Sequence, residues 1–181
     1  MDSTLASADA VSVRMKAPSR VVALGAVLLA VACVLGLVEA SLPALPVAPW
    51  LRLGLANIAV VVALALGGLR SAATVSIGRV VIVALATGTL LSPAFTMSAA
   101  GAVAALLAMA AAKAFGPRLS LVGWSAAGSV AHVIGQFAAA ALVLGTGSVV
   151  VLAPPSALLA LVFGVVVGSL ALVAVSRIPQ G

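Results

Sequence analysis

"LGLANIAVVVALALGGLRSAATVSIGRVVIVALATGTLL", residues 53–91, contains two long apolar runs that are separated only by a pair of glycines and one arginine. A bilayer core takes roughly 20 apolar residues per helix, with about 17 to 25 tolerated. Each run meets that length, and GGLRS has the composition of a break. We therefore predict two membrane helices, 53–69 and 71–91, joined by a short turn.

The rest of the chain divides in the same way. Breakers cut it into four more apolar segments, at 21–42, 93–112, 119–144 and 155–175. Of the 181 residues 65% are hydrophobic and 7% are charged, and the mean hydropathy is +1.39, far outside the range of soluble globular domains. We predict an all-α integral membrane protein with a six-helix bundle over residues 21–176, a disordered tail at 1–20 and a short tail at 177–181.

The basic residues predict how the bundle is oriented. The chain has nine Lys and Arg residues and three acidic residues, which gives a net charge of +6. They lie between apolar runs, which favours a role in membrane orientation over nucleic-acid binding. The positive-inside rule then puts both termini in the cytoplasm, because Arg52 alone flanks a segment on the outside. The predicted cytoplasmic residues are Arg14, Lys16, Arg20, Arg70, Lys113, Arg118 and Arg177.

Some polar residues fall inside or beside the apolar segments, where burial is costly. Arg79 lies about 12 Å beyond the start of its segment, which favours contact with an anion or with helix-end carbonyls or Glu39. Glu39 is close to the outer end of the first segment, and Asn57 opens the second. Arg52 stands beside Trp50, as an interface anchor or a ligand contact. Together they predict a pocket that faces outward below the loop 43–50.

His132 and Gln136 lie four residues apart, and Gly128 lies four residues before them, so all three share one helix face. The glycine offers a close approach and the other two offer hydrogen bonds. A histidine inside a membrane bridges helices, recognises a ligand or couples protons. All three roles remain open from the sequence.

The residue inventory argues against autonomous catalysis. Diphosphate chemistry with Mg²⁺ needs several carboxylates, and Glu39 is the only one outside the first twenty residues. One histidine and one cysteine, Cys33, make no recognisable zinc site or catalytic triad, and no Walker A motif occurs. We expect a binding or conducting subunit that needs no cofactor.

Three phrases carry a family resemblance: WLRLGLANIAVVVALALGG, IGRVVIVALATGTLLSPAF and GSVAHVIGQ. In this order the chain resembles, over residues 21–175, the Gx transporter family, also labelled heptaprenyl diphosphate synthase component I. That family is similar to the S components of energy-coupling factor transporters. The resemblance implies a compact six-helix bundle in a bacterial plasma membrane, with both termini inside. It also implies substrate binding together with a transmembrane coupling subunit and ATPases.

Carried over by position, the family phrases fall on Arg52 to Asn57, on Arg79, on Ser92 to Phe95 and on Ala131 to Gln136. Two positions depart from the pattern. Val133 stands where the family commonly has Asn, and Arg52 stands where it often has Lys, which keeps the charge and changes the geometry.

Our leading hypothesis is an S-component-like subunit that binds a small polar, anionic or isoprenoid-bearing ligand. The loop 43–50 would form a lid over its site, and a partner helix would dock at Ala26 and Ala30. The site residues would be Arg52, Asn57, Arg79, His132 and Gln136, with Glu39 as a balancing charge. A second hypothesis is a non-catalytic accessory subunit of polyprenyl diphosphate or menaquinone synthesis, partnered by a prenyl diphosphate synthase. A third is a membrane component of flavin- or quinone-based extracellular electron transfer.

Overall fold

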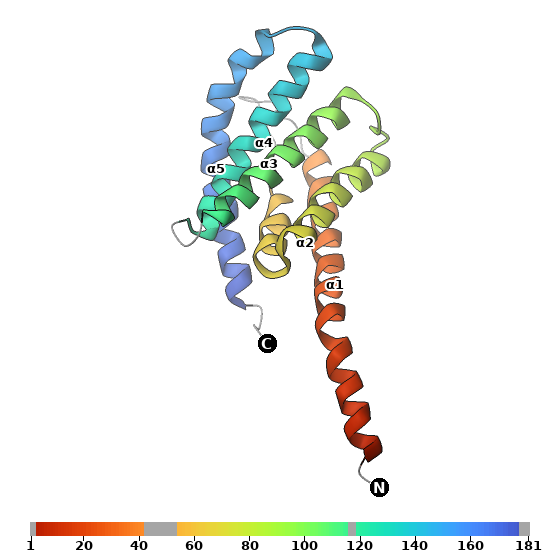
Figure 1. The fold of residues 1–181 in the computed structure, drawn as a ribbon. Helices are drawn as coiled ribbons and strands as arrows, with labels where there is room; N and C mark the ends of the chain where they lie inside the picture. Colours follow the sequence, from red (N-terminus) through yellow and green to blue (C-terminus); the bar gives the residue numbers. More distant parts are fainter. Residues whose placement is uncertain (1–2, 42–53, 116–118, 178–181) are drawn as a thin grey trace.

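A computed structural model describes residues 3–41, 54–115 and 119–177, with side chains from residue 20 onward. This part of the chain is helical throughout its regular structure. Figure 1 shows α2 to α5 gathered into one bundle, with α1 at its side and the first part of α1 projecting beyond it. The first residues of α1 and the last of α5 lie toward the same end of that view. The elements are α1 (Ser3–Ser41), α2 (Asn57–Ala86), α3 (Pro93–Ala114), α4 (Leu121–Leu144), the 3₁₀ helix η1 (Ser148–Leu152) and α5 (Ala153–Arg177).

Five stretches of the described chain are long and apolar enough to cross a membrane. They lie in the five α-helices, the last of them including η1. The prediction of an all-helical, multi-pass membrane chain is confirmed at this level. Six segments were predicted and five are found in the described chain, because α2 spans most of both predicted segments 53–69 and 71–91.

α2 is divided at Gly68, within the predicted break. Gly68 has φ 74° and ψ −171°, a backbone conformation that is essentially restricted to glycine. The preceding Gly67 is restricted by space, since a Cβ there would lie 2.6 Å from the Cβ of Ser71. The first half of α2, residues 57–67, extends over about 16 Å. It is therefore shorter than the predicted segment 53–69, and residues 51–53 lie outside the described part.

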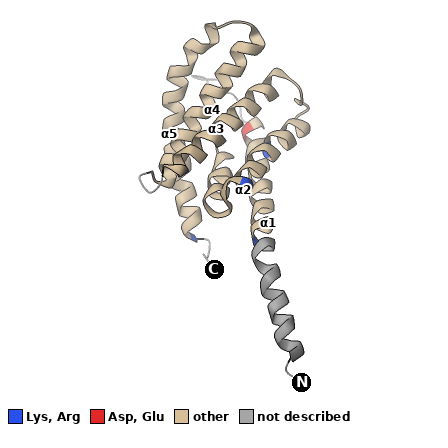
Figure 2. Ribbon diagram, in the orientation of Figure 1, with Lys and Arg blue, Asp and Glu red and all other residues tan. Residues whose placement is uncertain are grey.

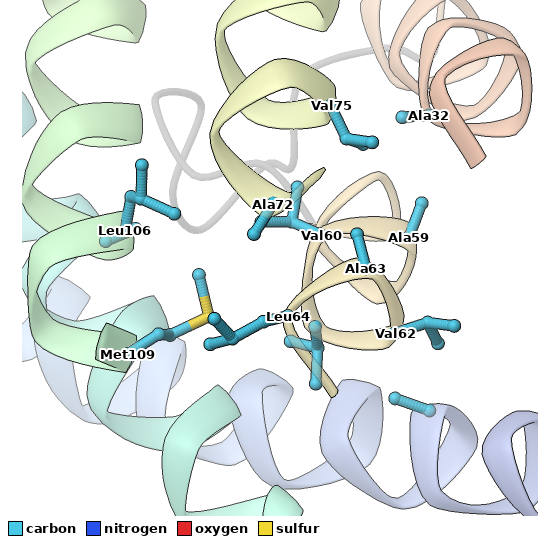
Figure 3. Close-up of a cluster of buried hydrophobic side chains, with 13 residues drawn as sticks. Ala32, Ala59, Val60, Val62, Ala63, Leu64, Ala72, Val75, Leu106 and Met109 are labelled. Carbon is cyan, nitrogen blue, oxygen red and sulfur yellow. The ribbon is translucent and has the colours of Figure 1, made fainter. Parts of the chain in front are cut away.

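The core is built around this first half of α2. Every residue from Ala59 to Leu64 is buried, so the short helix is covered on all sides, as an apolar helix without a polar face requires. Figure 3 shows its side chains between those of α1, α3 and the second half of α2. The buried cluster consists of Ala32, Ala59, Val60, Val61, Val62, Ala63, Leu64, Ala72, Val75, Ala105, Leu106, Met109 and Ala171.

α1 lies at the side of the bundle and, among the described elements, packs against α2 alone. Its contacting face includes Ala32, which is fully buried, and Gly36, where a Cβ would lie 3.1 Å from a methyl group of Val83. The opposite face exposes Ala26 and Ala30. The predicted docking residues thus lie on a face that the rest of the described chain does not cover.

The disordered tail predicted at 1–20 stays a prediction. In the structure, α1 starts at Ser3. The membrane-length part of this helix begins at Arg20, close to the predicted start at residue 21. Once an apolar helix is established, each further residue adds a backbone hydrogen bond without a new nucleation cost, so the helix extends beyond its apolar part. The C-terminal tail beyond Arg177 lies outside the described residues.

Glycines let the remaining helices approach closely. On the α4–α5 contact, a Cβ at Gly164 would lie 2.8 Å from the Cα of Ala126, and one at Gly168 would lie 2.7 Å from the Cα of Val122. Side chains at these positions would collide with backbone, which cannot move aside. Small residues thus set the helix spacing here, as is common where membrane helices pack through van der Waals contact.

Candidate functional site

Charged residues are sparse in this bundle, as the ribbon colours in Figure 2 show. Arg52 and the loop 43–50 lie outside the described residues, so their predicted roles stay predictions. The other predicted site residues fall on two contacts between helices. Glu39, Asn57 and Arg79 belong to α1 and α2, and His132 and Gln136 belong to α4.

Glu39 lies near the end of α1 and is 9% exposed. Its Oε1 accepts a hydrogen bond of 2.5 Å from the backbone N–H of Leu55. Leu55 belongs to the turn that leads into α2, where the N–H of Asn57 donates to the carbonyl of Gly54 at 2.9 Å. The amino end of a helix carries partial positive charge, so the Glu39 carboxylate lies where it is stabilised electrostatically. The structure thus brings Glu39 close to the start of α2, which includes Asn57.

Arg79 is half-buried and lies against α1. A Cβ at Gly36 would lie 3.8 Å from the Cγ of Arg79 and 3.9 Å from its Cδ, so the methylene stem of the arginine packs across this glycine. Gly36 precedes Glu39 by three residues, which places both on the same face of α1. Glu39 and Arg79 therefore share the contact between α1 and α2, which we call the α1–α2 seam.

His132 and Gln136 meet α3 at Gly101. A Cβ at Gly101 would lie 2.8 Å from the Cγ of Gln136 and 2.9 Å from the Cε1 of His132. Both side chains thus lie over one glycine, and their predicted position on a common face is confirmed. The close approach predicted at Gly128 is confirmed as well, because a Cβ there would lie 2.6 Å from the Cγ of Met109.

These contacts separate the predicted site residues into two groups. Arg79 lies against α1, and His132 lies against α3, while α1 makes no packing contact with α3 or α4 in the described part of the chain. Both residues have further interactions beyond these contacts. A single pocket that includes both remains a prediction.

Lys113 has a role that the sequence reasoning missed, since it was assigned to membrane orientation only. Its Nζ donates a hydrogen bond of 2.6 Å to the carbonyl of Leu64 and lies 5.5 Å from the centre of the Trp124 ring. Leu64 is in the last turn of α2 before the break at Gly68. The signal was present in the sequence, because a helix that stops at a glycine pair leaves carbonyls that need donors.

The described polar groups can bind charged and hydrogen-bonding partners. Within the described ranges, no group of three or more His, Cys, Asp and Glu residues is arranged to hold a metal ion. The buried Nε1 of Trp124 and Oγ of Ser125 have no hydrogen-bond partner there. A carboxylate, a guanidinium, an amide and an imidazole recognise charge and hydrogen-bonding groups.

A comparison with known families gives one result that covers most of the chain. A family model described as heptaprenyl diphosphate synthase component I matches residues 28–173. The matched range includes the last third or so of α1, from residue 28 to its end, all of α2, α3 and α4, and nearly all of α5. No curated protein and no solved structure matches the chain.

Proposed function

Because the chain belongs to the heptaprenyl diphosphate synthase component I family, we propose that it is a membrane-embedded subunit that binds a small ligand and works with a partner protein. The resemblance stated from the sequence phrases is thereby confirmed. The proposed ligand is polar or anionic, and an isoprenoid-bearing diphosphate or a quinone-related molecule fits that description. The proposal resembles the role of an S component in an energy-coupling factor transporter.

The observation that carries this proposal is the α1–α2 seam. Glu39 and Arg79 lie there within apolar helices, where a charged group is expensive to keep. Charged residues at membrane depth commonly mark a substrate or ion pathway. The positive charge of Arg79 suits a carboxylate or phosphate, and the apolar helix surfaces around it suit a hydrocarbon chain.

We further propose that the chain passes the membrane six times, with both termini in the cytoplasm. The basic residues near the predicted inner ends support this topology. The break at Gly68 lets the chain turn between the two halves of α2. A pass through the first half would also need residues before Asn57, because residues 57–67 extend over about 16 Å. Because Glu39 lies near the end of the first membrane helix, a cytoplasmic N-terminus would place it near the outer surface, where a ligand would enter.

The binding proposal is tested with Arg79→Ala and His132→Ala in protein extracted into lipid nanodiscs. Native mass spectrometry reports the retained ligand, and its mass identifies the chemical class. We expect each change to reduce ligand retention by roughly tenfold, because each removes a hydrogen-bonding group that is charged or lies at membrane depth.

Arg177→Ala is the matched control, since Arg177 is exposed at the end of α5. It removes a positive charge and should leave ligand retention unchanged. Full retention in both the Arg79 and the His132 variants would contradict the site assignment.

The family description favours a second candidate, an accessory subunit of a prenyl diphosphate synthase. This chain would then present or receive a lipidic substrate or product while a soluble partner performs the transfer. Co-purification with a soluble prenyltransferase, together with a change in the rate or chain length of its product, would support this candidate over the first.

A further inference from the structure

The first half of α2 is held by a charged side chain at each end. Glu39 of α1 accepts from the N–H of Leu55 at the start, at 2.5 Å. Lys113 of α3 donates to the carbonyl of Leu64 near the end, at 2.6 Å. The two charges come from different helices, and each has the sign that the helix dipole favours at its end.

Glu39 supplies an acceptor in the turn just before the helix, because Leu55 precedes the N-cap residue Ala56. The first N–H groups of an α-helix have no partner within the helix, and a carboxylate there is stabilised by the positive end of the dipole. Since Glu39 is 9% exposed, salt and water screen this attraction only weakly.

Lys113 supplies a donor at the other end. The helix stops at Gly68, so the carbonyls of its last turn, beginning with Leu64, lack the partners that a continuous helix would give them. The ammonium group of Lys113 lies 5.5 Å from the centre of the Trp124 ring, which adds a cation–π attraction from α4.

Between its ends the half-helix offers only apolar side chains. From Ile58 to Leu66 the sequence is IAVVVALAL. Apolar contacts hold a helix in place without fixing its direction, because they are not directional. The charged side chains Glu39 and Lys113 add directional contacts to this packing, at Leu55 and at Leu64. Each contact constrains the end of the half-helix at which it lies.

We propose that residues 55–67 form a gate with two separate latches, Glu39 at the outer end and Lys113 at the inner end. Neutralising one charge loosens the end that it holds, while the other latch keeps the opposite end closed. Such an element gives access to the core from one side of the membrane at a time. This role as a gate rests on the proposed ligand-binding function, whereas the two latches themselves do not.

Hydrogen–deuterium exchange of the full chain in nanodiscs tests the latches with Glu39→Gln and Lys113→Met. In Glu39→Gln we expect the amides of residues 55–58 to exchange about tenfold faster or more, with residues 65–69 unchanged. Lys113→Met should give the reverse pattern. Arg70→Gln is the control for Lys113, because Arg70 is an exposed basic residue that lies just after the break.

Equal acceleration at both ends in either variant, or no acceleration in either, would overturn the proposal. Amides of residues 160–168, in the packed α4–α5 contact, serve as the internal reference for general loosening. If a variant fails to fold, amide exchange in the unaltered protein still tests the two latches. Different exchange rates for residues 55–58 and for residues 65–69 support two latches, and a single correlated opening of both ends refutes them. If the amides at the two ends exchange separately but the unaltered protein retains no ligand, the result counts against the proposed binding function and not against the latches.

Discussion

Gly68 shows how much of this fold depends on a single backbone conformation. Its φ of 74° with ψ −171° is open to glycine and strained for any residue with a Cβ. Nothing lies within 4 Å of the place where a Cβ would be, so the restriction is conformational and not one of space. This conformation at Gly68 changes the direction of the chain between the first and second halves of α2.

We expect Gly68→Ala to lower the free energy of unfolding by about 1–3 kcal/mol, the usual cost of such a backbone strain. Thermal unfolding of the purified protein in detergent measures the change. Gly147→Ala is the matched control, because Gly147 has φ −80° and open space around its Cβ position. The two variants showing the same stability would contradict the assigned role of Gly68.

At the scale of elements, α3 and α4 are fitted to one another by glycines on both helices. Gly101 of α3 receives His132 and Gln136, and Gly135 of α4 lies so close to α3 that its Cβ would meet the carbonyl oxygen of Ala100 at 2.8 Å. The start of α3 is also fixed by an N-cap, since the hydroxyl of Ser92 accepts a hydrogen bond from the N–H of Phe95 at 3.2 Å. His132 thus has a structural role in packing alongside any role in binding.

A double-mutant cycle with Gly101→Ala and His132→Ala tests that packing role. Gly101→Ala alone should destabilise the protein by about 1–3 kcal/mol, because the new methyl group overlaps the imidazole and the Gln136 stem. Adding His132→Ala should recover part of the loss, which gives a coupling energy of about 0.5 kcal/mol or more. Additive effects, measured by thermal unfolding, would mean that the two positions are independent.

The whole molecule is asymmetric, with one helix left largely outside the packed bundle. α1 contacts α2 alone among the described elements, and its other face carries the small residues Ala26 and Ala30. Small residues allow the backbone of another membrane helix to approach closely. This arrangement supports the proposal that a partner subunit docks on α1.

We expect Ala26→Leu combined with Ala30→Leu to abolish co-purification of the partner, because the larger side chains keep its helix at a distance. Stability should hardly change, since both positions are exposed. Val31→Leu, on an exposed position of α1 that lies off the stripe of Ala26 and Ala30, is the control and should retain the partner. Unchanged partner recovery in the double variant would move the docking surface elsewhere.

The sequence by itself determined the helical membrane class and most helix boundaries. Segments of membrane length separated by breakers predict both, and the chain follows them closely at Pro93, Leu144 and the glycine pair before Leu69. Spacing also determined that His132 and Gln136 share a face, because the helix period is fixed. The polar residues could therefore be found from the sequence.

Only the tertiary structure decided which helix each polar residue meets. Spacing along one helix gives the face of a side chain but not the neighbour that this face contacts. Arg79 lies against α1 and His132 lies against α3, and neither neighbour could be predicted from the sequence. Lys113 likewise acquired its contact with Leu64 through packing between residues 49 positions apart. Such long-range partners depend on how apolar faces pack, and many packings satisfy the same apolar pattern.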